Sequence, residues 1–164
     1  MEVFGVYSNV IDKSLDASST AALTVRATVA GDKVTLIADV SALPAGMTDA
    51  KLHLVLAERM LLFGGENGIR GHHMVVRGVA GESGQGLPIA KTGTSQFTFD
   101  LAQIREGITR SLAADITRRA GQGAPYAAAD HAMTTIDVSQ LVAVAFIQAP
   151  DKKILQATKA DVKK

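Results

Sequence analysis

The stretch from Lys51 to Val79 constrains the fold of this chain more than any other segment. Two strongly apolar runs flank the sequence Gly-Gly-Glu-Asn-Gly at 64–68. Asn-Gly between apolar runs is a strong hairpin signal, because both residues tolerate the positive φ that a tight hairpin turn requires. The segment therefore predicts a β-hairpin with Asn67 and Gly68 as its two loop residues.

This turn predicts the strand register, with Glu58 opposite Arg77 and Phe63 opposite His72. Both faces of the hairpin are apolar, so we expect both to be covered by other parts of the chain. A bulge at the glycines of 64–65 would shift this register. Two interpretations of Glu58 and Arg77 remain open. One is an ion pair inside the sheet, which we favour because an unpaired buried charge is costly. The other is an anchor for a ligand carboxylate or a partner chain.

The remaining elements follow from apolar periodicity. Apolar and polar residues alternate in the first two strands, as expected for half-buried strands. Apolar residues at helical spacing predict one amphipathic helix near 101–119, closed by Gly121, and a short helix capped by Ser8-Asn9. We expect loops at 81–93 and 122–135. Strands are predicted at 23–29, 34–40, around 97–99, 141–148 and 153–161. The pattern is typical of a mainly β chain, an antiparallel β-sandwich of the immunoglobulin-like type with one crossover helix.

Composition narrows the classes of function. Hydrophobic residues make up 47% of the chain and charged residues 20%, which suffices for a packed core. The net charge of +1 gives no electrostatic reason to expect nucleic acid as a partner. The absence of cysteine excludes disulfides and thiolate chemistry within the chain. No apolar run is long enough to span a bilayer, so we predict no membrane insertion.

Three segments together carry a family resemblance. They are N-G-I-R-G-H-H-M-V-V-R at 67–77, F-T-F-D-L-A-Q-I at 97–104 and V-A-V-A-F-I-Q-A-P-D-K-K-I-L-Q-A at 142–157. They resemble the carboxy-terminal β-sandwich domain of bacterial exported thioredoxin-like (redoxin) proteins, which is related to a domain of certain outer-membrane lipoproteins. Residues 7–15 resemble the last helix of the preceding thioredoxin-like domain. The resemblance implies that 1–17 is the tail of that domain or a linker helix, and that 18–164 is the sandwich domain.

The resemblance also implies a role and a place. The chain would be a piece of a longer periplasmic or extracellular protein, and a non-catalytic accessory domain for docking, substrate presentation or dimerisation. Its partners would be the upstream thioredoxin-like domain, another protein or a second copy. The redox Cys-x-x-Cys of such proteins lies upstream, so thiol–disulfide activity does not carry over. The alternative is a small-molecule or carbohydrate-binding module that uses the 81–93 loop and a pocket lined by Arg70, Tyr126 and His131.

Candidate site residues gather on the predicted hairpin. We predict no catalytic residue, cofactor or metal, since no spacing fits a known motif. His72 and His73 are adjacent in a strand and point to opposite faces, so they cannot easily share a zinc ion with His53. Ser83 does not fit the nucleophile motif G-x-S-x-G. The candidate structural or binding cluster consists of Glu58, Asn67, Gly68, Arg70, His72 and Arg77.

Overall fold

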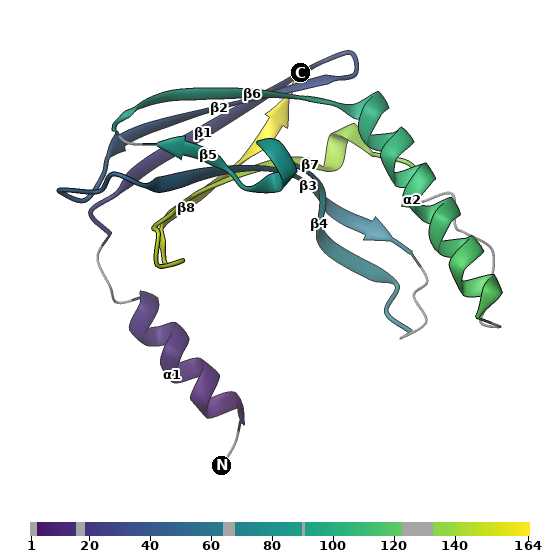
Figure 1. Ribbon diagram of the computed structural model, residues 1–164, viewed down its shortest axis with the longest axis horizontal. Helices are drawn as coiled ribbons and strands as arrows, with labels where there is room; N and C mark the ends of the chain where they lie inside the picture. The colour runs from purple at the N-terminus through teal and green to yellow at the C-terminus, as the bar shows by residue number, and fades with distance from the viewer. Residues whose placement is uncertain (1–2, 16–18, 64–67, 90, 123–132) are drawn as a thin grey trace.

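The computed structural model describes residues 3–15, 19–63, 68–89, 91–122 and 133–164 (Figure 1). Within these ranges the chain is mainly β, with eight strands hydrogen-bonded into one strongly curled sheet and two α-helices. The strands are β1 (Ala22–Ala30), β2 (Lys33–Ala42), β3 (Ala50–Leu62), β4 (Gly71–Val79), β5 (Leu87–Ile89), β6 (Gly93–Asp100), β7 (Leu141–Gln148) and β8 (Ile154–Lys163). The helices are α1 (Val3–Leu15) and α2 (Leu101–Gly121), with short 3₁₀ turns η1 (Glu82–Gly84) and η3 (Val138–Gln140).

The strand order across the sheet is β4-β3-β7-β8-β1-β2-β6, and β5 also pairs with β3. The predicted mainly β class is therefore confirmed. The predicted two-sheet sandwich is not confirmed, since all the described strands join in one sheet. Most neighbours are antiparallel, but β1 and β8 are parallel, with Ala27 opposite Val162.

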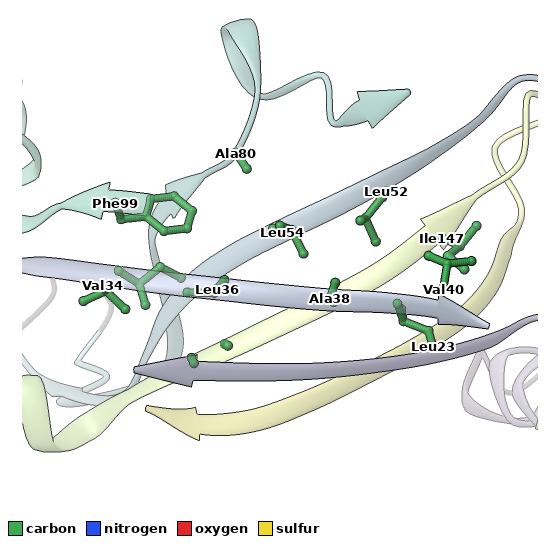
Figure 2. Packing of buried hydrophobic residues seen from close by; sticks show 14 of the residues in the cluster. Leu23, Val34, Leu36, Ala38, Val40, Leu52, Leu54, Ala80, Phe99 and Ile147 are labelled. Carbon is green, nitrogen blue, oxygen red and sulfur yellow. The ribbon is translucent and has the colours of Figure 1, made fainter. Parts of the chain in front are cut away.

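Local periodicity explains most of the strands. The predicted hairpin of β1 and β2 is confirmed, with Val29 opposite Val34 and Gly31 at a φ of 57° in the turn. Along β2 every second residue is buried, from Val34 to Val40. These side chains meet those of β3 and β7 in the core (Figure 2). Among the most deeply buried are Val34, Leu36, Leu52, Leu54, Leu56, Leu141 and Ile147.

The curl brings the two edge strands of the sheet together at one point. A Cβ on Gly78 of β4 would lie 2.8 Å from Cδ1 of Phe99 in β6 and 3.3 Å from Cδ1 of Ile104 in α2. Glycine, which has no side chain, allows this approach without moving Phe99. The two ends of the curled sheet therefore face each other across the core. In the predicted sandwich, two separate sheets would have enclosed this core.

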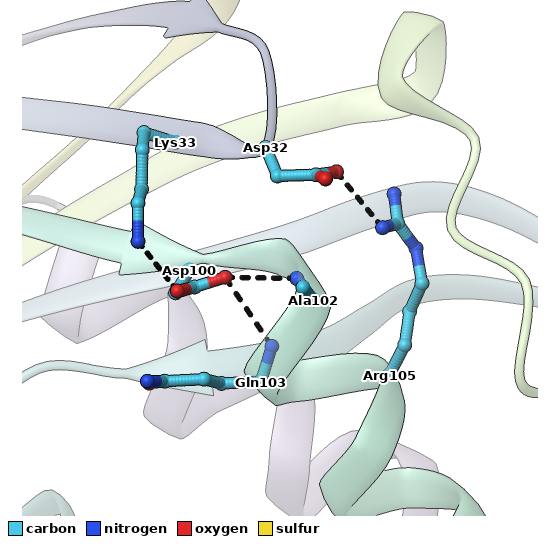
Figure 3. A network of polar contacts seen from close by, with 6 residues as sticks. All are labelled: Asp32, Lys33, Asp100, Ala102, Gln103 and Arg105. Carbon is cyan, nitrogen blue, oxygen red and sulfur yellow. Dashed lines mark hydrogen bonds and ion pairs between the residues drawn. The ribbon is translucent and has the colours of Figure 1, made fainter.

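The helix α2 begins where β6 ends, and polar contacts fix its start (Figure 3). Oδ1 of Asp100 accepts hydrogen bonds from the backbone N–H groups of Ala102 (3.0 Å) and Gln103 (3.3 Å), as an N-cap does. Arg105 pairs with Asp32 in the β1–β2 turn at 2.9 Å. The predicted helix near 101–119 is confirmed. The β1–β2 turn fixes the start of α2 through the contact of Asp32 with Arg105.

Three local predictions are wrong. Ser8 and Asn9 lie inside α1, which begins earlier, so they do not cap it. Residues 87–89 form a strand on β3, whereas the glycine content of 81–93 predicted a loop. The β3–β4 hairpin is not covered along both faces by the residues that the structure describes, since Val76 is 57% exposed. The predicted loop at 122–135 lies mostly outside the described residues.

The helix α1 lies away from the sheet (Figure 1). It exposes three large apolar side chains, Tyr7, Val10 and Ile11. Neither described helix combines the length and the apolarity that crossing a membrane requires.

Candidate functional site

Glu58 and Arg77 form a buried ion pair at the β4 end of the sheet. Nε of Arg77 donates to Oε2 of Glu58 at 2.7 Å, and Nη2 of Arg77 lies 2.6 Å from the same oxygen. The two side chains are only 3% and 4% exposed. The predicted contact between these residues is therefore present.

The predicted register is nevertheless wrong. Glu58 lies opposite Val75, and Leu61 lies opposite His72. Pairing ends where the N–H of Phe63 donates to the carbonyl oxygen of Arg70 at 2.8 Å, so the connection is longer than the predicted two residues. A longer connection moves the pairing by two positions along β4.

The observed register alone would separate Glu58 from Arg77, but a β-bulge in β4 brings the two side chains together. Leu56 faces Gly78 and Ala57 faces Val76, so Arg77 is an extra residue without an opposite partner. A bulge re-aims the side chain of its extra residue. Here it directs Arg77 to the core face of the sheet, where the side chain reaches Glu58.

The pair holds the segment that leads from α2 back to β7. Arg77 donates from Nη1 to the carbonyl oxygen of Met133 (3.1 Å) and from Nη2 to that of Thr135 (3.0 Å). Oε1 of Glu58 accepts from the N–H of Asp137 at 3.2 Å. Both charged groups are thus satisfied by the chain itself, as buried charges must be. This arrangement favours the structural interpretation over an anchor for a ligand carboxylate.

The other members of the predicted cluster do not converge on this pair. Asn67 lies outside the described residues. Gly68 and Arg70 are exposed where the hairpin connection ends. A ring nitrogen of His72 lies 3.2 Å from the carbonyl oxygen of Phe63, and the two rings are tilted at 6.0 Å. The cluster is therefore two separate places, a buried ion pair and an exposed hairpin end.

The histidines considered for zinc are also separate. His53 is opposite Phe146 of β7, whereas His73 is exposed on β4. Among the residues that the structure describes, no three His, Asp or Glu side chains are placed to hold a metal ion. Tyr126 and His131, named for a ligand pocket with Arg70, lie outside the described residues.

The structure reveals a groove that the sequence did not predict. It has a volume of about 530 Å³ and lies between α2 and the bulge of β4. Its apolar lining comes from α2 and from Met133, and Arg77 also lines it. The lining residues are Arg77, Ile104, Gly107, Ile108, Ser111, Leu112, Asp115 and Met133. Helical periodicity indicates the apolar face of α2, but not what faces it.

Exposed apolar side chains concentrate on the β3–β4 hairpin. Nine large apolar side chains are exposed in the described part of the chain, and five of them belong to this hairpin. We call these five the hairpin surface: Leu62, Ile69, Met74, Val76 and Val79. The only charged residue within β4 is Arg77, which is buried in its ion pair. Contiguous patches of exposed apolar side chains are typical of interaction surfaces.

Comparison of the chain with protein-family models, curated proteins and solved structures found no match. The resemblance to the domain of exported thioredoxin-like proteins therefore stays a prediction.

Proposed function

We propose that this chain is a non-catalytic protein-interaction domain that binds a partner through the hairpin surface. The observation that carries the proposal is the 57% exposure of Val76, with four further exposed apolar side chains on the same hairpin. Burying such side chains against a partner contributes favourable free energy in proportion to the apolar area removed from water. The partner surface that fits the five side chains is apolar.

The resemblance identifies the partners to test first. An accessory domain of an exported thioredoxin-like protein would dock on the upstream thioredoxin-like domain or on a second copy of itself. The periplasmic or extracellular location and the immunoglobulin-like sandwich belong to the same proposal. The close approach of the two sheet edges at Gly78 supports a sandwich-like arrangement. The tail assignment of 1–17 is supported by the position of α1 away from the sheet (Figure 1).

The test is a matched pair of surface variants. Val76→Lys places a charge on the hairpin surface, and Gln96→Lys places one on an exposed position of β6. We expect Val76→Lys to weaken self-association, measured by sedimentation velocity, or the affinity for a thioredoxin-like domain, measured by calorimetry. Gln96→Lys should change neither. Equal association of both variants and the unchanged chain would contradict the proposal, as would no association in either assay.

The small-molecule alternative is supported by one observation, the groove beside α2. Its volume of about 530 Å³ lies in the usual range for ligand sites, and its lining is mostly apolar with a few polar side chains. If this groove binds ligands, Leu112→Glu should abolish binding of an apolar fluorescent probe, while Gln96→Lys should leave it unchanged. Probe binding that is insensitive to Leu112→Glu would remove the groove from consideration.

A further inference from the structure

His53 lies in β3 beneath a covering segment that the proposed function does not use. Its ring stacks on Phe146 with a centroid distance of 4.6 Å and an interplanar angle of 7°. Gly86 lies over the ring, since a Cβ at this position would be 2.9 Å from Cε1 and 3.0 Å from Nε2 of His53. The imidazole is thus held between an aromatic ring and a stretch of backbone.

The covering segment consists of residues 80–89, and we call it the latch. At one end the N–H of Ala80 donates to the carbonyl oxygen of Leu54 at 2.8 Å. At the other end β5 pairs with β3, with Ile89 opposite Ala50 and Leu87 opposite Leu52. Between these attachments lie η1 and the glycines at 81, 84 and 86, all with positive φ. The latch therefore has two fixed ends and a glycine-rich middle that covers His53.

The surroundings of His53 suit only the neutral ring. Nε2 is buried and has no hydrogen-bond partner among the described residues. Two cations, Lys51 of β3 and Lys152 of the β7–β8 turn, repel a proton on the ring. The side chain of Gln148 in β7, which hydrogen-bonds to the ring, carries no charge. The only ionisable residue of the latch, Glu82, is exposed. A protonated ring would leave a buried N–H without an acceptor beside two like charges, which is costly.

We propose that residues 80–89 form a pH-sensitive latch, which is closed over neutral His53 and opens when His53 gains a proton. Opening releases β5 from β3 and frees the strand edge at Ala50–Leu52. An unpaired strand edge presents backbone N–H and C=O groups to other chains. Acidification would thus create a second binding edge, independent of the hairpin surface.

The direction of the pH effect follows from the shift at His53. Burial, opposed by the Gln148 hydrogen bond and reinforced by Lys51 and Lys152, lowers the pKa of His53 from its usual 6.5. The open latch binds the proton with nearly the usual pKa. The opening equilibrium is therefore constant above about pH 6.5 and rises about tenfold per pH unit as pH falls toward the pKa of the closed state. Below that pKa it is constant again.

Amide hydrogen exchange across this pH range tests the latch. After correction for intrinsic exchange, the protection of the amides at 80–89 should fall about tenfold per pH unit below pH 6.5. In His53→Phe, whose ring can still stack on Phe146, this protection should not depend on pH. His73→Phe, which removes an exposed histidine of β4, should keep the wild-type dependence. Protection independent of pH in the wild type, or a dependence that survives in His53→Phe, would overturn the proposal.

Two further measurements keep the proposal testable if His53→Phe does not fold. An NMR titration of the unchanged chain should place the pKa of the His53 imidazole below its usual 6.5, and a pKa at or above 6.5 would overturn the latch. Gly86→Ala inserts a Cβ against the ring and is strained at a φ of 78°. Its latch amides should be unprotected at every pH, while the amides of β4 stay protected. Because none of these readouts involves a partner, they remain valid if the proposed function fails.

Discussion

The two edge strands of the sheet present different chemistry to their surroundings. In β6, Gln96 and Thr98 are exposed, while Phe97 and Phe99 pack on the core. The outward hydroxyl of Thr98 lies 3.0 Å from that of Thr35 in β2. In β4, by contrast, three of the exposed positions hold large apolar side chains, Met74, Val76 and Val79, beside the exposed His73. The polar face of β6 is suited to water, and the apolar face of β4 is suited to a partner.

The backbone of β4 sharpens this difference. Met74 has a φ of 53°, which is unusual for a residue other than glycine, and the bulge at Arg77 interrupts the ladder nearby. Irregularities of this kind discourage the indiscriminate addition of strands at a sheet edge. The comparison teaches that β4 differs from β6 in two respects: it exposes large apolar side chains, and its hydrogen-bonding edge is irregular. Variants at five positions test this contrast between β4 and β6.

The largest effect is expected at the ion pair that fixes β4 to the sheet. Glu58→Leu or Arg77→Leu leaves a buried charge without its partner, which should lower the free energy of unfolding by about 3–5 kcal/mol. The double change to leucine should cost clearly less than the sum of the two. Urea unfolding of the three variants measures the coupling. Additive effects would mean that the two side chains are not coupled, contrary to their 2.6 Å contact.

A smaller effect is expected where the two edges meet. Gly78→Ala forces Phe99 to move, because the new Cβ would lie 2.8 Å from its ring. Overpacking of this kind should lower the free energy of unfolding by about 1–3 kcal/mol. Thermal unfolding provides the measurement. An unchanged melting temperature would show that the edges do not close at this point.

The matched control for this glycine lies in α2. A Cβ on Gly107 would meet nothing within 4 Å, and the position is inside a helix. Gly107→Ala should therefore raise the free energy of unfolding by about 0.5–1 kcal/mol, because glycine loses more backbone entropy on folding. Changes of opposite sign in the free energy of unfolding at Gly78 and Gly107 would distinguish a steric clash from an effect on backbone entropy. A loss of stability at Gly107 would show that α2 packs more closely than described.

The smallest effect is expected at the end of the β6 edge. The pKa of Asp100 is lowered by its hydrogen bond with Lys33 and by the N–H groups that it caps. A lowered pKa means that the carboxylate stabilises the fold above pH 3.8, and that this contribution is lost as pH falls toward the folded-state pKa. Asp100→Asn keeps a capping side chain but not the charge. Its slightly lower melting temperature at neutral pH should converge with that of the wild type in acid, and a constant difference would contradict the assignment.

The sequence predicted individual strands and helices better than the way in which the strands pair. Alternation in β2 and helical spacing in α2 are local, so the chain displays them directly. Pairing between distant strands leaves no such pattern, which is why the parallel contact of β1 with β8 and the single sheet were not predicted. The short strand β5 was not predicted, because three residues that include Pro88 show too little periodicity.

At the candidate site, too, local features were predicted and the pairing of the strands was not. The contact of Glu58 with Arg77 was predicted because two charges in apolar runs need each other. Its register was wrong, because a turn signal does not report the length of the connection or a bulge two residues beyond Val75. The setting of His53 had no local signal either. It depends on Gly86, which reaches the ring from another part of the chain.

The parallel contact between β1 and β8 also has a consequence for synthesis. Ala27 pairs beside Val162, so a ribosome must add more than a hundred residues before β1 acquires this neighbour. Until then the β1–β2 hairpin has one bare flank. Contacts this distant along the chain slow folding, because a large loop must close first. The nascent chain is therefore expected to need protection from aggregation until β8 has emerged, and stalling shortly before residue 154 should yield a chaperone-bound intermediate.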